Sequence, residues 1–318
     1  MYYFLTRFGP WLFLVACFVL PLGFASDYQM FQLTMVAVYS IAILGLNLVT
    51  GYNGQVSLGH GAFYAVGAYV TAIMMDKWGV PYWATLPVAA VISAGIGFLL
   101  GFPALRLGGL YLALTTFALA VATPQLLKYK AFEEWTGGVQ GIVIDKPDAP
   151  FGLPLNPDQW LYIFCLIVAA VLFILSANLV DGRIGRAMRA IRDHPLAAEA
   201  MGIDIGLFKT RTFAVSAMIT GIAGSLGAIA IQFVAPDSFS AVLSTSLFVG
   251  MAIGGGASIA GAIAGAVFIE FIPNVADQIS KAAPSAVFGV ILMAFVFLMP
   301  GGLAGVMRAI GRRLKRVG

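Results

Sequence analysis

Apolar runs about as long as a membrane is thick recur from one end of this chain to the other. The hydrocarbon core of a bilayer is about 30 Å thick, and a helix needs roughly 20 mostly apolar residues to cross it. Of the 318 residues, 60% are hydrophobic and only 10% are charged, whereas soluble domains carry roughly 25% charged residues. The sequence therefore predicts membrane-crossing helices and excludes a water-soluble fold.

Ten stretches have the length and composition of membrane spans. They lie at residues 8–25, 30–50, 56–75, 82–104, 108–128, 159–180, 212–234, 242–256, 259–273 and 284–300. The eighth and ninth are short and are separated by three glycines, so we expect one of them to be a broken or re-entrant helix. The predicted fold is an all-α, polytopic membrane helix bundle of about ten transmembrane helices, forming a single domain over residues 1–318.

The distribution of charge over the loops predicts the orientation of the bundle. Short cytoplasmic loops hold an excess of Lys and Arg. Residues 181–211 and the tail after the last span are rich in basic residues, whereas residues 129–158 carry more acidic than basic residues. We expect the 181–211 loop and both termini to be cytoplasmic and 129–158 to be an ordered external loop. The first 25 residues are expected to be a retained helix, with a cleaved signal peptide as the alternative.

Glycines inside the apolar runs predict close helix packing. They recur as Gly97-x-x-x-Gly101, Gly221-x-x-Gly224-x-x-Gly227 and Gly261-x-x-x-Gly265. Small residues at such spacings let the backbones of two membrane helices approach each other closely. Contact with a ligand is the alternative use of these glycines.

Ionisable side chains are scarce within the predicted spans. The best candidates are Arg106 and Glu270, and both fall near predicted span ends, where long side chains reach the headgroups. Carriers driven by an ion gradient place such groups near the membrane midplane. The scarcity argues against an ion-coupled secondary transporter, which stays the alternative from another class of protein.

The 181–211 loop begins with the pattern of a surface helix. Ile184, Met188 and Ile191 recur at helical spacing, and arginines cover the other sides. Such a helix lies on a membrane or on protein, with its basic face toward headgroups or a partner.

The same loop continues with a second short helix. Pro195 suits a first helical position, Asp193 or His194 can cap the helix, and Gly202 can end it. A helix of about two turns between two spans can dock in the groove of a partner. The alternative is a surface linker whose charges only set the topology.

Five blocks of sequence resemble the branched-chain amino-acid permeases of ATP-binding-cassette (ABC) importers. They are GYNGQVSLGHGAFYAVGAYV from Gly51, LRLGGLYLALTTFALA from Leu105, WTGGVQGI from Trp135, RAIRDHPLAAEAMGID from Arg189 and PGGLAG from Pro300, in the order of the family. The Glu-Ala-Ala motif of ABC-importer permeases is matched in part by residues 198–202, where Met201 replaces a small residue. The resemblance covers most of the chain.

The resemblance implies a type II ABC-importer-like permease of the bacterial plasma (inner) membrane for branched-chain or related apolar amino acids. It implies a second permease subunit in a heterodimer, two cytoplasmic ATPase subunits, a periplasmic or extracellular solute-binding protein and membrane lipid as partners, and no nucleic acid. Urea and amide permeases of the same branch have similar sequences and are the alternative. The implied ATPase-coupling residues are Arg192, His194, Pro195, Glu199, Ala200 and Gly202, with Arg192 and Glu199 as contacts to the ATPase.

The sequence also predicts that this chain catalyses no reaction itself. It contains no G-x-x-x-x-G-K-[ST] phosphate loop, and the glycine-rich segment from Gly51 has no lysine to reach phosphates. Ser57 and His60 alone are too slight an arrangement for a nucleophile and base. Neither His60 nor His194 has a metal-ligand partner at a suitable spacing. We expect no catalytic residue, metal or cofactor here, and ATP to be used by the partner subunits.

Uncharged polar side chains are the candidates for the translocation pathway. They are Asn47, Asn53, Gln55, Ser57, His60, Tyr64, Thr115 and Thr116. A polar group inside a membrane protein is costly unless it bonds across helices or faces a cavity. Bracing of the backbone and lining of the pathway both stay open. A mildly polar and apolar pathway suits a small zwitterion with an aliphatic side chain.

Overall fold

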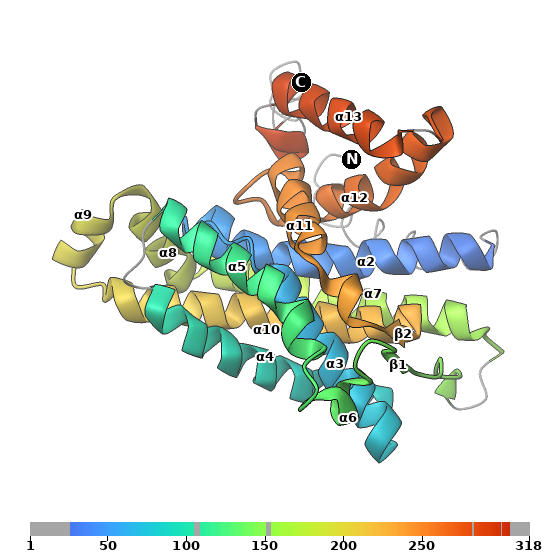
Figure 1. Ribbon diagram of the computed structural model, residues 1–318. Coiled ribbons are helices and arrows are strands. Elements are labelled where there is room, and N and C mark those ends of the chain that lie inside the picture. The colour runs from blue at the N-terminus through green and yellow to red at the C-terminus, as the bar shows by residue number, and fades with distance from the viewer. Residues whose placement is uncertain (1–25, 105–108, 151–153, 282, 300, 306–318) are drawn as a thin grey trace.

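The computed structural model describes residues 26–104, 109–150, 154–281, 283–299 and 301–305, and it is almost entirely helical (Figure 1). Seven segments are long and apolar enough to cross a membrane: Asp27–Tyr52, Tyr82–Phe102, Leu110–Leu127, Pro157–Asp181, Ile205–Ile231, Pro236–Gly254 and Ile259–Ile279. The predicted all-α, polytopic membrane fold is confirmed, whereas the expected number of about ten spans is not. The expected first span, residues 8–25, lies outside the described residues.

The described helices are α2 (Asp27–Asn47), α3 (His60–Trp78), α4 (Tyr82–Ala104), α5 (Leu110–Leu127), α6 (Glu133–Thr136), α7 (Pro157–Asp181), α8 (Arg183–Asp193), α9 (Pro195–Ala200), α10 (Ile205–Ile231), α11 (Ala241–Gly254), α12 (Ile259–Ile279) and α13 (Pro284–Leu298). Short connections join most of them, whereas residues 137–156 separate α6 from α7. A π-helical turn, Leu48–Tyr52, continues α2, and a 3-10 turn, Pro236–Phe239, precedes α11. Helices α3 and α13 occupy the expected third and tenth spans, but α3 is less apolar and α13 is shorter than the seven segments above.

Helix α12 is longer than the sequence suggested. The predicted span ended at residue 273, whereas the helix passes through Pro273 and ends at Ile279. Membrane helices tolerate an internal proline because neighbouring groups satisfy the freed backbone carbonyl. The expectation that Glu270 lies near a span end is therefore wrong, since Glu270 stands near the middle of α12. Arg106 lies outside the described residues.

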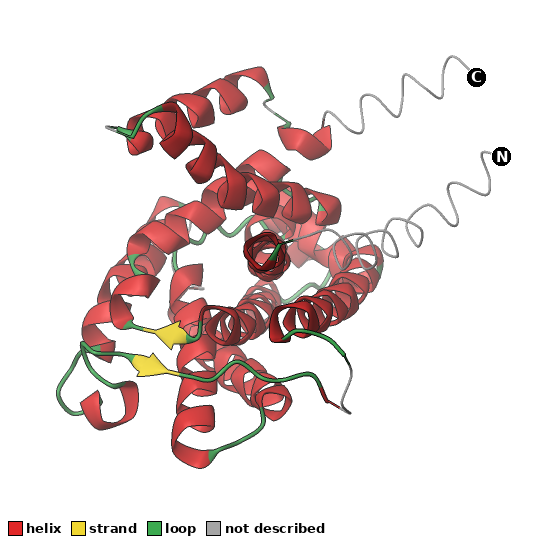
Figure 2. Cartoon of the chain, turned by 90° about the vertical axis from the view of Figure 1, so that its right-hand side faces the viewer, coloured by secondary structure: helices red, strands yellow, loops and turns green. Residues whose placement is uncertain are grey.

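Helix α2 forms the centre of the bundle. Most of its side chains are buried, among them Ile41, Ile43 and Leu44 at 0% exposure. It contacts α7, α10, α11 and α12, and Figure 2, which looks along the bundle, shows the other helices arranged around it. A movement of α2 would therefore be transmitted to most of the membrane domain.

Glycines allow the central helices to touch backbone to backbone. A Cβ atom added at Gly67 of α3 would fall 1.8 Å from the carbonyl oxygen of Gly221 in α10. One added at Gly224 would fall 1.9 Å from the carbonyl oxygen of Tyr64, and one at Gly261 would fall 2.5 Å from that of Gly254. These contacts confirm the predicted packing role of the glycines in α10 and α12.

The basic and acidic loops lie at opposite ends of the bundle (Figure 1). Helices α8 and α9 stand at one end. At the other end lie α6 and a two-stranded antiparallel sheet, in which β1 (Ile142–Val143) pairs with β2 (Phe233–Val234). The sheet and an ion pair of 2.5 Å between Lys128 and Asp237 hold the 129–158 loop against the chain that follows α10.

Candidate functional site

Helix α8 packs one side against the bundle and leaves the other side open. Its buried residues are Gly185, Met188 and Ile191. Ile184, which the sequence predicted to lie on the packed side of this helix, is instead 48% exposed. Gly185 lies against the preceding helix instead, where an added Cβ would fall 1.9 Å from the Val180 carbonyl oxygen. The predicted amphipathic helix is present, but in its first turn the buried residue is Gly185 and not Ile184.

Helix α9 has the predicted boundaries of a short, rigid helix. Pro195 occupies its first position after a break at His194, and the His194 carbonyl accepts the first helical hydrogen bond, from the amide of Ala198. The expected cap is formed by this backbone, with no side-chain bond from His194. The helix ends at Ala200, and Gly202 follows with a φ of +82°, a conformation that favours glycine.

Two large apolar side chains of the α9 segment project from the bundle. Leu196 is 82% exposed and Met201 is 84% exposed, while Glu199 and Ala200 are exposed beside them. The sequence analysis identified the motif residues of this segment but missed Leu196. The signal that could have indicated it is an apolar residue directly after the proline that starts the helix. Exposed apolar side chains next to a charged one are typical of a surface that a protein partner covers.

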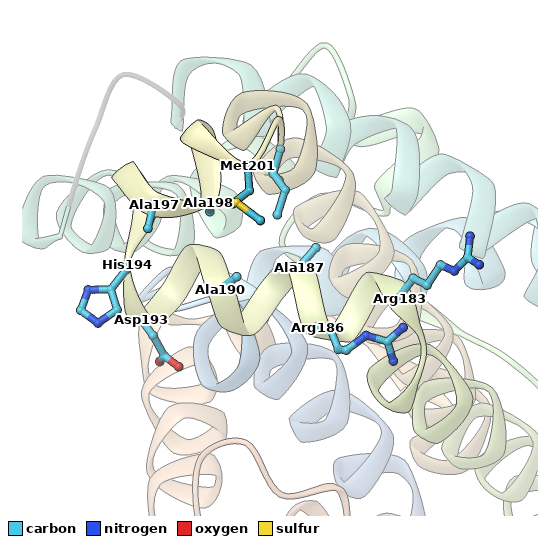
Figure 3. Close-up of a pocket in the computed structure, with 10 residues that line it drawn as sticks. Arg183, Arg186, Ala187, Ala190, Asp193, His194, Ala197, Ala198 and Met201 are labelled. Atoms are coloured by element: carbon cyan, nitrogen blue, oxygen red, sulfur yellow. The ribbon is translucent and has the colours of Figure 1, made fainter.

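A groove of about 570 Å³ separates α8 and α9 (Figure 3). Figure 3 shows Met201 reaching over the groove, with Arg183 and Arg186 toward one end and Asp193 and His194 at the other. Between the charged ends, small side chains line it: Ala187, Ala190, Ala197 and Ala198. The groove is therefore lined by small side chains along its middle and by charged side chains at its two ends.

Arg192 connects this hairpin to the central helix. Its Nη1 donates a hydrogen bond of 2.8 Å to the carbonyl oxygen of Gly51, in the π-helical turn that continues α2, and its Nε lies 2.9 Å from Asp193 Oδ1. Gly54 makes room for the arginine stem, since an added Cβ would fall 2.7 Å from Arg192 Cγ. The structure thus places Arg192 against its own chain.

Asn47 extends this connection to the α11–α12 junction. Its Oδ1 accepts a hydrogen bond of 2.9 Å from the amide of Ala257, and its Nδ2 donates one of 2.8 Å to the Ser258 carbonyl. Gly51 lies beside the same junction, and the space between Asn47 and Ala257 is too small for a side chain at this position. One end of α2 therefore holds both the α8–α9 hairpin and the start of α12.

A buried chain of hydrogen bonds runs from Ser57 to α2. His60 Nδ1 lies 2.9 Å from Ser57 Oγ, and His60 Nε2 lies 2.6 Å from Ser216 Oγ. Because the Ser216 hydroxyl donates to the Gly45 carbonyl at 2.6 Å, it must accept from His60. The neutral tautomer with hydrogen on Nε2 satisfies every member, with Ser57 donating to Nδ1.

Two further hydroxyls fix the backbone where α3 begins. Thr116 of α5 accepts a hydrogen bond of 2.9 Å from the amide of Leu58, and Ser244 of α11 accepts one of 2.9 Å from the amide of Gly61. Residues 57 and 58 are therefore held by α5 directly and by α10 through His60, while α11 holds the first turn of α3. Bracing is the role that the geometry shows for Asn47, Ser57, His60 and Thr116.

The remaining pathway candidates are not brought into this network. Asn53 and Gln55 are buried at 1% and 5% exposure, and the Asn53 side chain and Gln55 Nε2 have no hydrogen-bond partner among the described residues. The Tyr64 hydroxyl is also without one. Thr115 is exposed and bonds to the Tyr111 carbonyl of its own helix. Within the described part of the chain, no group of three His, Cys, Asp or Glu side chains could hold a metal ion.

A helical bundle with seven membrane-length segments in its described part has the architecture of a multi-pass membrane protein. The family model described as "Branched-chain amino acid transport system / permease component" matches residues 30–299. Since this range covers most of the chain, the protein belongs to that family of permeases.

Curated relatives agree with the family. The high-affinity branched-chain amino acid transport system permease protein LivM of Escherichia coli is 35% identical over 77% of this chain and 63% of its own length. LivM of Salmonella typhimurium is 36% identical over 70% of this chain and 57% of its own length. The probable permease LivH of Methanocaldococcus jannaschii is 26% identical, with 83% and 87% covered. The chain thus matches less than two thirds of either LivM protein, and no solved structure matches it.

Proposed function

We propose that this chain is one permease subunit of an ABC importer for branched-chain or related apolar amino acids. The observation that carries the proposal is the exposed helix α9, whose hairpin is fastened to the central helix by the hydrogen bond from Arg192 to Gly51. The names of the LivM and LivH relatives support the substrate class. ATP would be bound and hydrolysed by separate subunits, so that this chain needs no cofactor.

Helix α9 would act as the coupling helix. In this account Leu196, Glu199 and Met201 contact an ATPase subunit, and closure of the ATPases on nucleotide displaces the hairpin. Arg192 and Asn47 then carry the displacement to α2 and to α12, because Arg192 bonds to the turn that continues α2 and Asn47, in α2, bonds to the chain just before α12. Rigid elements with two arrangements are what such switching requires.

The remaining subunits would meet the chain on its other surfaces. A second permease of the LivH kind would complete the pathway in the plane of the bacterial inner membrane, and a solute-binding protein would dock at the end that carries α6 and the β1–β2 sheet. The basic end with α8 and α9 would be cytoplasmic, in keeping with the excess of positive charge on short cytoplasmic loops.

Uptake in vesicles tests this function. The chain is reconstituted with candidate ATPases, a LivH-type permease and a binding protein, and uptake of radiolabelled leucine and urea is measured with and without ATP. Leucine uptake that requires ATP is the expected result. Uptake without ATP would point to an ion-coupled transporter and overturn the proposal, whereas uptake of urea alone would move the substrate to the urea and amide branch.

A further inference from the structure

A second groove lies where α4, α7, α8 and α10 meet, at the end of the bundle that carries the basic loop. Its volume is about 360 Å³, and apolar side chains from all four helices line it, among them Phe98, Leu179, Ile184, Phe208 and Val215. Along α10 it extends from Phe208 to Val215, a length of roughly 10 Å at 1.5 Å per residue. The groove therefore has the lining and the size to hold part of a hydrocarbon chain.

The surface of α7 beside this groove has the composition of a lipid-facing surface. Every exposed side chain from residue 161 to residue 177 is large and aliphatic: Ile167, Val171, Ile174 and Leu175. Interfaces between membrane helices are instead enriched in small residues, as they are between α3 and α10. On the other side of the groove, Leu99 and Phe102 of α4 are exposed as well. We therefore expect the groove to face the hydrocarbon of the bilayer.

Arg211 brings a positive charge to this apolar groove. Its side chain is one of those that line the groove, and it is exposed. Within the described part of the chain, no carboxylate forms an ion pair with it. Asp204, the nearest carboxylate in the sequence, instead caps α10 by accepting a hydrogen bond of 2.9 Å from the amide of Leu207. An unpaired guanidinium is suited to bind a phosphate group, with which it forms two parallel hydrogen bonds.

Ile184 joins the groove to the basic face of α8. It lines the groove although it is half-exposed, and the exposed Arg183 and Arg186 lie on either side of it in the sequence. Neither arginine has an ion-pair partner among the residues that the structure describes, and Arg186 donates only to the carbonyl oxygen of Asp181, at 3.4 Å. Basic residues beside a membrane attract anionic lipids. The charges around the groove therefore favour an anionic lipid over a zwitterionic one.

We propose that this groove binds one anionic phospholipid from the leaflet on the side of α8 and α9. The Arg211 guanidinium donates hydrogen bonds to the lipid phosphate, and an acyl chain lies along Phe98, Leu179 and Val215. Because four helices line the groove, the bound lipid contacts all of them and stabilises their arrangement. The inference rests on the membrane-spanning fold and is independent of the solute that the protein transports.

Native mass spectrometry of the full-length chain in detergent tests this site. The protein is titrated with phosphatidylglycerol, which is anionic, or with phosphatidylcholine of the same acyl chains. Arg211→Gln removes the charge from the groove, and Ile184→Asp places a carboxylate beside the lipid phosphate. Both side chains are exposed, and melting temperatures in detergent check that the variants are folded. Lys209→Gln is the matched control, because it removes the same charge from the same helix and Lys209 does not line the groove.

We expect the wild-type chain to retain one phosphatidylglycerol at concentrations at which phosphatidylcholine is not retained. Arg211→Gln should raise the dissociation constant about tenfold, as loss of a charged hydrogen bond implies, and Ile184→Asp should raise it at least as far. Lys209→Gln should bind the lipid as the wild type does. Equal retention of both lipids, or equal effects of Arg211→Gln and Lys209→Gln, would overturn the site. Release of the lipid when a LivH-type permease associates with the chain would also overturn it and would assign the groove to a subunit interface.

Discussion

Arg192 Nη1 lies 2.8 Å from the carbonyl oxygen of Gly51, and this hydrogen bond joins the α8–α9 hairpin to the end of the central helix across 141 residues of sequence. The donor is charged, and hydrogen bonds of charged groups contribute roughly 1.5 to 3 kcal/mol. Because Arg192 is partly exposed to solvent, we take the low end of that range. If the proposed coupling is right, loss of this bond should affect transport more than stability.

Replacement of Arg192 by alanine should separate assembly from coupling. We expect Arg192→Ala to lower the free energy of unfolding by only about 1.5 kcal/mol and to lower the amount of leucine imported per ATP hydrolysed, because α8 loses its bond to the turn that continues α2. The measurement is uptake and hydrolysis in the same vesicles. Arg189→Ala removes the same charge one turn earlier on α8 and should keep the wild-type ratio; an unchanged ratio in Arg192→Ala would contradict the connection.

Gly54 should resist replacement more than another glycine of similar conformation. Gly54 has a φ of +72° and Gly79 a φ of +59°, so alanine costs roughly 1 to 2 kcal/mol at either position. Only at Gly54 does the added Cβ collide with Arg192, since nothing lies within 4 Å of it at Gly79. Gly54→Ala should therefore lower the melting temperature of the detergent-solubilised protein further than Gly79→Ala, and equal shifts would refute the packing argument.

Loss of the Ser216 hydroxyl should leave a buried imidazole N–H without an acceptor. We expect Ser216→Ala to destabilise the protein by roughly 1 to 3 kcal/mol, the penalty for an unsatisfied buried donor. Thr115→Ala is the control, because the Thr115 hydroxyl is exposed and bonds only within its own helix. Thermal unfolding of both variants is compared with that of the wild type. A Ser216→Ala protein as stable as Thr115→Ala would show that His60 does not need this bond.

Asn47 offers a test that depends on the direction of its hydrogen bonds. Asn47→Asp keeps the acceptor for the Ala257 amide but replaces the donor to the Ser258 carbonyl by a second oxygen. A buried carboxylate facing a carbonyl is unfavourable, so this nearly isosteric change should destabilise the protein at least as much as Asn47→Ala. A melting temperature of Asn47→Asp close to that of the wild type would mean that the amide is not held as described.

The elements of the fold that the sequence predicted are those with strong local signals. Pro195 and Gly202 bound α9 because their backbone preferences act within one turn. The expected end of the span at residue 273 was wrong, since a proline signal is overridden where neighbouring helices satisfy the backbone, and Glu270 consequently moved from an end to the middle of α12.

Contacts between distant segments were beyond prediction from one sequence. The motif around Glu199 identified the hairpin, but nothing in the order of residues indicates that Arg192 turns toward Gly51 or that Asn47 bonds to Ala257. Those contacts depend on how α2, α8 and α12 pack in three dimensions. Whether the polar residues brace the backbone or line the pathway likewise could not be decided without their hydrogen-bond partners.

If the α9 segment couples this chain to an ATPase, ATP-driven leucine uptake in the reconstituted importer should fall in the variants Leu196→Asp and Glu199→Arg. Arg189→Ala, which removes a charge from α8 outside the α9 segment, is the matched control. We predict that both α9 variants reach the membrane at wild-type abundance. Their leucine uptake should fall at least about tenfold, because contacts with the partner are lost, while the control should transport leucine at the wild-type rate. Wild-type uptake by Leu196→Asp and Glu199→Arg would contradict the account.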